Sequence, residues 1–245
     1  MKNLTNIIII LLLLAVGLLT FMSGRLIYPL GSQGKKIIEK TVDEFLEDKV
    51  FDLMWKKTIH WTTFFESLDG YATTGTVNIS ENDVVLTTGA STDDSASIYK
   101  APSWQGLITF NQKSYWRTTA TLNNVDDVTE YLVVGSLASG SYYGFKIVDD
   151  SLMGVSFDGR TEKTTTLAAV SAAHTYNIEA RYTPSDKIVF LVDAVESGVI
   201  TENLPLPNDV PNLTLFTFKI ITGSDTAKTL QASFFEYLQS RNVLQ

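Results

Sequence analysis

The sequence predicts an all-β fold, in which two antiparallel sheets pack as a sandwich behind a transmembrane helix and a short amphipathic helix. Three observations predict this. An uncharged apolar run lies near the N-terminus, a stretch with helical spacing of apolar residues follows it, and from Tyr71 onward short Val/Ile/Thr/Tyr/Phe runs alternate with turn residues. We divide the chain into an anchor (1–30), a linker with a stalk helix (31–60) and a β-sandwich (61–245).

The composition allows a buried core and excludes several functions. Of the 245 residues, 44% are hydrophobic and 19% are charged, which is too apolar for a disordered chain. The net charge is -8, and no basic run is interleaved with aromatic residues, so nucleic acid is not expected as a partner. The absence of cysteine removes disulfides, thiol nucleophiles and thiolate metal sites.

The first apolar run is long enough to serve as a membrane anchor. Ile7 to Met22 carry no charge, and together with Leu26 to Tyr28 they can cross a hydrocarbon core of about 30 Å as a helix. We therefore expect residues 7–28 to lie in a lipid bilayer, with Arg25 reaching the headgroups. A cleaved signal peptide is the alternative, but Phe21 to Gly24 make a poor cleavage site.

The β region is expected outside the cell or on a virion surface, as part of a single-pass membrane protein. Charge alone does not set this orientation, because Lys2 competes with Arg25, Lys35, Lys36 and Lys40 under the positive-inside rule. The location rests on the composition, which is rich in Thr, Ser, Asn and Tyr and typical of an exported β domain.

The stalk is predicted to be an amphipathic helix. Within residues 36–55, Ile38, Val42, Phe45 and Leu46 begin an apolar stripe at helical spacing, with acidic residues between them. The stripe can pack on its own domain, lie on the membrane surface or mediate self-association through a coiled coil, although Lys49 interrupts the seam of a coiled coil.

The β region contains one clear hairpin and several further strands. Apolar and polar residues alternate from Tyr176 to Thr183, Pro184 to Asp186 make a turn, and the chain returns through Ile188, Phe190 and Val192. Asp149-Asp150 and Asp158-Gly159 are further turn signals. The other expected strands are Asp83–Thr88, Trp116–Leu122, Tyr131–Gly135, Tyr143–Val148, Leu152–Phe157, Leu213–Ile221 and Thr229–Leu238.

Three segments resemble a known family. The order YYGFKIVDDSLMGVSFDGRTEKTTTL, YNIEARYTPSDKIVFLVDAVESGVI and TLQASFFEYLQSR is similar to the second half of concanavalin A-like (laminin-G-like) jelly-roll domains. The resemblance covers about Phe64 to Arg241 and implies a jelly-roll sandwich of the lectin and glucanase type. One departure is Ala194, where the family usually has a turn glycine after Asp193, which suggests a different turn.

Aromatic side chains are the candidate ligand-binding groups. Trp104, Trp116, Tyr142 and Tyr143 offer flat apolar faces that can stack on sugar rings, although a tryptophan in a sandwich is more often part of the core. Tyr142 and Tyr143 are neighbours, so on a strand one of them must face outward.

Calcium is the one metal ion for which the sequence offers candidates. The acidic pairs Asp93-Asp94 and Asp149-Asp150, and also Asp126-Asp127, lie in expected loops, where oxygen ligands suit Ca²⁺. The alternative is that these aspartates bond to the local backbone. His60 and His174 have no partners at zinc-ligand spacing.

The function expected from these residues is a lectin-like, non-enzymatic module that binds glycans or a protein surface. Glycoside hydrolases of this fold carry Glu-x-Asp-x-Glu on one strand, and no such triplet occurs here. Glu179 is instead expected to form a surface ion pair with Arg181. A structural component of a virion or surface assembly is the alternative, and a hydrolase has the least support.

Overall fold

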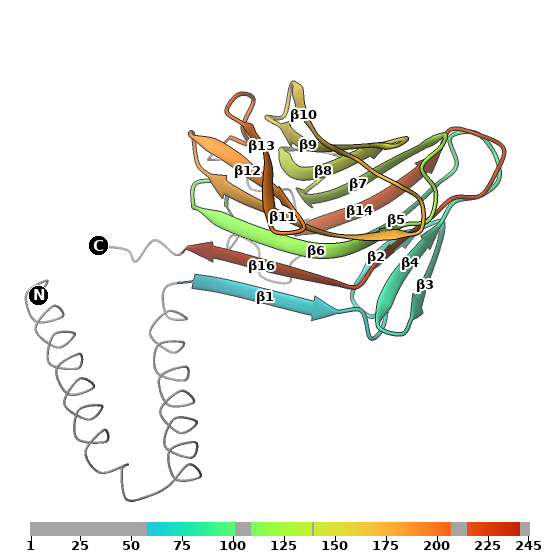
Figure 1. Cartoon of the computed structure of the whole chain (residues 1–245). Helices are drawn as coiled ribbons and strands as arrows, with labels where there is room; N and C mark the ends of the chain where they lie inside the picture. Colours follow the sequence, from blue (N-terminus) through green and yellow to red (C-terminus); the bar gives the residue numbers. More distant parts are fainter. Residues whose placement is uncertain (1–57, 101–108, 139, 207–214, 241–245) are drawn as a thin grey trace, which may run out of the picture. The chain divides into compact units, whose positions relative to one another are not determined.

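A computed structural model of the chain describes residues 58–100, 109–138, 140–206 and 215–240 (Figure 1). The chain divides into two units, Met1–Lys56 and Lys57–Gln245, and every described residue belongs to the second. The predicted anchor at 7–28 and the stalk helix at 36–55 lie outside the described residues. No helix of the described part is long and apolar enough to cross a membrane.

The first sheet, sheet A, has nine strands. They run in the order β13-β12-β11-β6-β15-β4-β3, and β16 lies between β6 and β1. The strands are β1 (Thr58–Phe64), β3 (Thr76–Ser80), β4 (Asp83–Thr87), β6 (Ser114–Leu122), β11 (His174–Thr183), β12 (Lys187–Val192), β13 (Val195–Ile200), β15 (Thr229–Ala232) and β16 (Phe234–Ser240).

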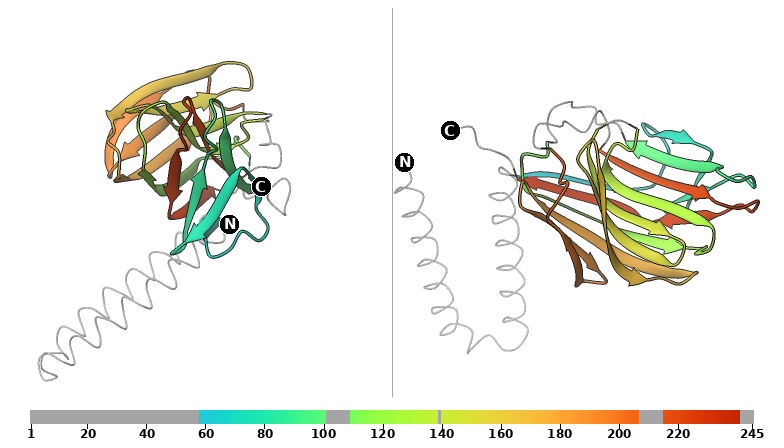
Figure 2. Two further views of the ribbon diagram at one scale, coloured as in Figure 1. Left: turned by 90° about the vertical axis from the view of Figure 1, so that its right-hand side faces the viewer. Right: turned by 90° about the horizontal axis from the view of Figure 1, so that it is seen from above.

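The second sheet, sheet B, has seven strands in the order β10-β9-β8-β7-β14-β5-β2. They are β2 (Ala72–Thr74), β5 (Ser95–Lys100), β7 (Val128–Gly135), β8 (Tyr142–Val148), β9 (Ser151–Phe157), β10 (Glu162–Ala169) and β14 (Phe216–Thr222). The strand pairs in both sheets are antiparallel, and the turned views in Figure 2 show the sheets as two layers. This confirms the predicted all-β sandwich.

Alternation of side chains along the strands forms the core. On β11, Tyr176, Ile178, Ala180 and Tyr182 are buried, whereas the residues between them face solvent or lie at the surface. The predicted hairpin closes through a hydrogen bond of 3.2 Å from the Asp186 amide to the Thr183 carbonyl.

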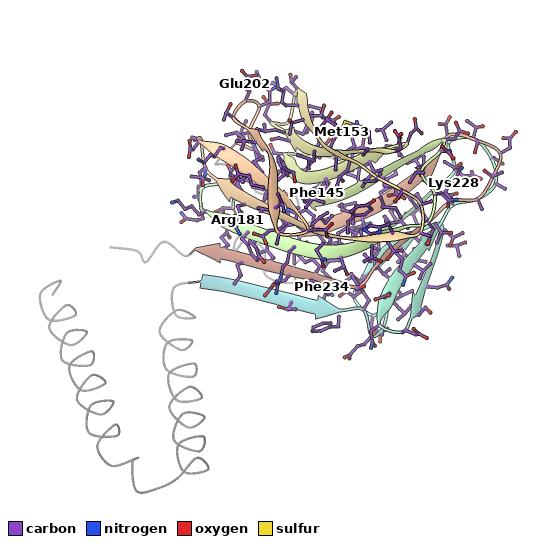
Figure 3. The ribbon with its side chains drawn as sticks, viewed as in Figure 1. Phe145, Met153, Arg181, Glu202, Lys228 and Phe234 are labelled. Carbon is purple, nitrogen blue, oxygen red and sulfur yellow. The ribbon has the colours of Figure 1, made fainter. Side chains whose placement is uncertain are left out.

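Aromatic rings fill the space between the sheets. Phe145 of β8 meets Trp116 of β6 edge-on, with ring centroids 5.6 Å apart, and Phe190 of β12 in the same manner at 5.4 Å. Phe235 of β16 stacks on Trp116 at 5.6 Å and on Phe216 of β14 at 4.6 Å. Phe145 lies inside the sandwich in Figure 3, and these contacts join both layers into one core.

The expected strand Thr229–Leu238 is two strands. Ala232 pairs with Ala120 of β6, but Glu236 pairs with Arg117, so β15 and β16 together contain one residue more than the facing part of β6. This extra residue is a β-bulge next to Ser233, and it reverses which alternate positions point into the core. Phe235 therefore faces inward and Phe234 faces outward.

The turn at Asp193-Ala194 has the same conformation as a turn with glycine in place of Ala194. Asp193 and Ala194 both have positive φ, 49° and 66°, between the paired residues Val192 and Val195. Two successive positive φ values are those of the two-residue hairpin turn that favours Asp-Gly. The expectation of a different turn was wrong, and Ala194 occupies a left-handed position that is costly for a side chain with a Cβ.

Strands from the two ends of the described domain lie side by side. β1 begins at Thr58, within the stretch assigned to the stalk, and pairs with β16 from Thr58 opposite Ser240 to Phe64 opposite Phe234. Figure 1 shows these two strands next to each other. The pairing closes the sheet with a long-range contact that local sequence patterns do not reveal.

Candidate functional site

The outer face of sheet B carries a group of aromatic and charged side chains on four neighbouring strands. We call it the aromatic face and define it by Tyr131 on β7, Tyr142 and Lys146 on β8, Phe157 on β9 and Glu162 on β10. These side chains point away from the core because they alternate with the inward residues of their strands.

Strand register brings these residues together. The Asp149-Asp150 turn between β8 and β9 pairs Tyr142 with Phe157, and Glu162 pairs with Phe157 from the other side. The rings of Tyr142 and Phe157 stack with centroids 5.1 Å apart and an interplanar angle of 25°. Cross-strand aromatic pairs of this kind stabilise a sheet and hold both rings in place.

A polar network surrounds the stacked rings. The Tyr142 hydroxyl donates to Glu162 Oε2 at 2.7 Å, and Lys146 Nζ donates to Glu162 Oε1 at 2.6 Å. Lys146 Nζ also lies 5.2 Å from the centre of the Tyr131 ring, within the range of a cation–π contact. One carboxylate therefore joins a phenol and an ammonium group on the same surface.

The surroundings keep these groups in defined protonation states near neutral pH. Burial raises the pKa of the Tyr142 hydroxyl well above its ordinary value, and the hydrogen bond to Glu162 raises it further. Burial lowers the pKa of Lys146, but its bonds to Glu162 and Tyr131 outweigh this effect, so the pKa is raised overall. Tyr142 is thus neutral and Lys146 is charged.

Apolar side chains on the same face of sheet B pack beside these rings. Val133 and Val155 are fully buried in this cluster, and Leu137 from the β7–β8 connection packs against them. Between Tyr142 and Lys146, β8 has Gly144, where an added Cβ would lie 2.3 Å from the Leu132 carbonyl oxygen. A side chain is sterically excluded at that point.

The arrangement is suited to binding a ligand that has both apolar and hydroxyl surfaces. Two carboxylate oxygens offer about four acceptor positions and an ammonium group has three donors, so Glu162 and Lys146 retain capacity beyond their mutual contact. The described strands of sheet B contain two carboxylates, Glu130 and Glu162, and these lie on opposite faces.

The predicted aromatic residues have different locations. Tyr142 lies on the aromatic face, 7% exposed. Tyr143 and Trp116 are 0% exposed between the sheets, and the Tyr143 hydroxyl is 2.7 Å from the Ser114 hydroxyl. Their assignment to a binding surface was wrong, because inward alternation makes both part of the core. Trp104 lies outside the described residues.

The candidate calcium ligands lie in turns, and two of them accept hydrogen bonds from backbone amides. Asp94 Oδ2 accepts from the Ser91 amide at 2.9 Å, and Asp149 Oδ1 accepts from the Val128 amide at 3.3 Å. Asp93 and Asp149 have positive φ, and Asp150 follows in the same turn as Asp149. Within the ranges that the structure describes, no three acidic or histidine side chains come together as a metal site.

The outer face of sheet A has a different chemistry. The predicted surface pair is confirmed, with Arg181 Nε 2.5 Å from Glu179 Oε1, and Arg117 forms a second pair with Glu236. Tyr115 lies among these charges, and burial together with Glu179 raises its pKa to about 12. Both arginines are more than half exposed, so these pairs are typical of a solvated sheet surface and contribute little to stability.

Sequence reasoning missed Tyr131, Lys146, Phe157 and Glu162 as members of the site. A two-residue turn at Asp149-Asp150 fixes the register of its hairpin, so the contact between Tyr142 and Phe157 follows from the turn once it is recognised. The position of Glu162 could not be found in this way, because it depends on the longer turn that follows Phe157.

Comparisons with known proteins show similarity in structure and none in sequence. No protein-family model matches the chain, and no curated protein matches its sequence. A protein of unknown function from Shewanella oneidensis MR-1 matches with a TM-score of 0.57 at 10% identity, over 77% of this chain and 89% of that one.

Two further matching structures belong to proteins whose names state an activity or a module type. A prokaryotic β-1,3-1,4-glucanase (lichenase) from a mouse hindgut metagenome has a TM-score of 0.56 at 9% identity, over 73% of this chain and 98% of the other. The shared fold is a jelly-roll sandwich of two antiparallel sheets. The CBM2 module of the evolved Dit of Lactobacillus casei BL23 phage J-1 matches with a TM-score of 0.54 at 9% identity, over 77% and 99%. At such low identity the likeness shows the fold alone.

Proposed function

We propose that this protein is a non-enzymatic, glycan-binding β-sandwich that is anchored in a membrane through residues 7–28 and faces outward. The observation that carries the proposal is the aromatic face, where the stacked rings of Tyr142 and Phe157 lie beside the Lys146–Glu162 pair. Outward display rests on the composition of the β region and on the apolar N-terminal run.

The chemistry of a sugar complements this surface. A pyranose ring has an apolar face that packs on an aromatic ring and a rim of hydroxyls that need donors and acceptors. On the aromatic face, Tyr131 offers a half-buried ring next to Lys146, and Glu162 can accept from a hydroxyl. Two proteins with the same fold, a lichenase and a CBM2 module, support a glycan as the ligand class.

The proposed site on sheet B does not include hydrolysis. Glycosidic cleavage requires two carboxyl groups on the same side of the substrate, about 5 to 9 Å apart. In the described strands of sheet B, Glu162 stands on the outer face and Glu130 on the inner face, so they cannot act on the same substrate. We expect no reducing-sugar release from a polysaccharide panel, and turnover abolished by Glu162→Gln would overturn this part.

A glycan array followed by calorimetry tests the binding. Tyr131→Ala is expected to weaken any detected glycan about threefold to tenfold, since the loss of one stacking ring costs roughly 0.5 to 1.5 kcal/mol. Tyr115→Ala is the matched control, because it removes a tyrosine from the outer face of sheet A. Equal loss in both variants, or no binding by the wild type to any glycan, would contradict the site.

Membrane anchoring has its own test. Cell fractionation and intact-mass analysis should find the mature chain in the membrane fraction with residues 7–28 retained. A mature protein that begins near Gly24 and is free in the supernatant would show that the segment is a signal peptide.

A structural role in a virion is the second candidate function. The observation that favours it is the fold shared with a module of a phage Dit protein. Electron microscopy of native membranes and particles separates the two candidates. A structural component should form a regular array, whereas a binding module should be scattered over the surface as single copies.

A further inference from the structure

Directly behind the aromatic face, the core contains an unpaired carboxyl group. Glu130 of β7 is 0% exposed and shares its inward direction with Val128, Leu132 and Val134. Neither of its carboxyl oxygens has a hydrogen-bond partner among the described residues. A charge at this position is strongly disfavoured, because nothing replaces the water that would solvate it.

No charged group compensates Glu130 from the strands around it. The inward residues of β8 and β14, its two neighbours, are Tyr143, Phe145, Ile147, Phe216, Phe218 and Ile220. The other buried titratable groups of the described interior are Tyr176, Tyr182, Tyr237 and Lys228, and the Lys228 ammonium is bound to the Asp126 carbonyl at 2.6 Å. Burial is the one cause that raises the pKa of Glu130, to about 8.

The same strand connects Glu130 to the aromatic face. Tyr131 is the next residue and points to the opposite side of the sheet. Glu130 is paired with Ile147 on β8 and with Ile220 on β14, while Tyr131 is paired with Lys146 and Lys219. A movement of β7 that gave Glu130 access to water would displace Tyr131 from Lys146.

We propose that Glu130 is a proton-dependent lock on the aromatic face, which holds β7 in the binding geometry while its carboxyl is neutral and releases β7 when it ionises. The inference rests on the proposed function for its effect on binding, but the lock itself is a property of the strand. The binding geometry of the aromatic face should therefore be most stable at acidic pH and be lost progressively as the pH becomes alkaline.

Amide hydrogen exchange of β7 tests the lock without any glycan. In the wild type, exchange of Val128–Gly135, corrected for intrinsic rates, should accelerate about tenfold per pH unit between pH 6 and 8 and then level off, following the ionised fraction of Glu130. Glu130→Gln, which is neutral at every pH, should be flat. Glu179→Gln is the matched control on the surface and should keep the wild-type profile.

Binding provides the second readout. For a mixed-linkage β-glucan oligosaccharide, the wild type should bind about tenfold more weakly at pH 9 than at pH 7, because at pH 9 Glu130 is neutral in about one molecule in eleven. The affinity of Glu130→Gln should be the same at both pH values. Glu130→Leu gives a second neutral variant if the glutamine variant does not fold. A flat exchange profile in the wild type, or an equal slope in the neutral variants, would overturn the lock. A flat binding result with the expected exchange would instead count against the glycan site.

Discussion

Gly154 of β9 is a position where the addition of one methyl group should measurably destabilise the core. Its Cβ, if present, would lie 2.6, 2.6 and 2.8 Å from three carbons of the Phe190 ring. Phe190 is fully buried and packs edge-on against Phe145 at 5.4 Å, so the ring has little room to retreat. Gly154→Ala should reduce the free energy of unfolding by about 1 to 3 kcal/mol, the usual cost of overpacking.

A double-mutant cycle identifies the clash as the cause. Phe190→Leu alone should also destabilise, but combined with Gly154→Ala it should recover about 1 kcal/mol or more relative to additivity, since the smaller side chain makes room for the methyl group. Gly223→Ala is the matched control, because its nearest atom would be the Asp127 carbonyl oxygen at 3.3 Å, and it should cost less than about 1 kcal/mol. Urea unfolding followed by near-UV circular dichroism measures all four. The steric argument would be refuted if Gly154→Ala left the free energy of unfolding unchanged, or if its effect and that of Phe190→Leu were strictly additive.

Three further predictions concern stability. Burial raises the pKa of Glu130 from its ordinary value of 4.5 to about 8, so the free energy of unfolding should be highest below pH 4.5, fall by at most about 5 kcal/mol as the pH rises to 8 and then level off. Urea midpoints at pH 5 and pH 8 should differ for the wild type and agree for Glu130→Gln. Tyr182→Phe should cost about 1 to 3 kcal/mol by thermal unfolding, because the hydroxyl is hydrogen-bonded to the Phe110 and Pro205 carbonyls at 2.9 and 3.0 Å, whereas an unchanged Tm would show that water replaces it. Ala194→Gly should stabilise by about 1 kcal/mol through relief of the positive φ, and a loss of stability would mean that the backbone at this turn is not strained.

Part of the candidate site was within reach of the sequence. Adjacent residues on a strand face opposite ways, so one of Tyr142 and Tyr143 had to point outward, and the Asp149-Asp150 turn sets the register that places Phe157 against Tyr142. Tyr143 alternates with Gly144 and Lys146 and shares its face with Phe145 and Ile147, so the local pattern also indicated that Tyr143 faces inward and Tyr142 outward. The sequence offered Tyr143 and Trp116 as ligand groups, and the second sheet buries both.

The sequence by itself determined the class of fold, because period-two alternation and turn residues are local properties that each strand carries independently of its partners. The hairpin of β11 and β12 and the inward direction of Tyr176 to Tyr182 follow from that alternation alone. Only the tertiary structure decided what lies between distant strands. The bulge next to Ser233 reverses the facing of β16, and β7 turns Glu130 into a core without a partner while it turns Tyr131 toward Lys146. These outcomes depend on pairing between strands far apart in the chain, where the burial of one large apolar surface outweighs the preference of any single residue.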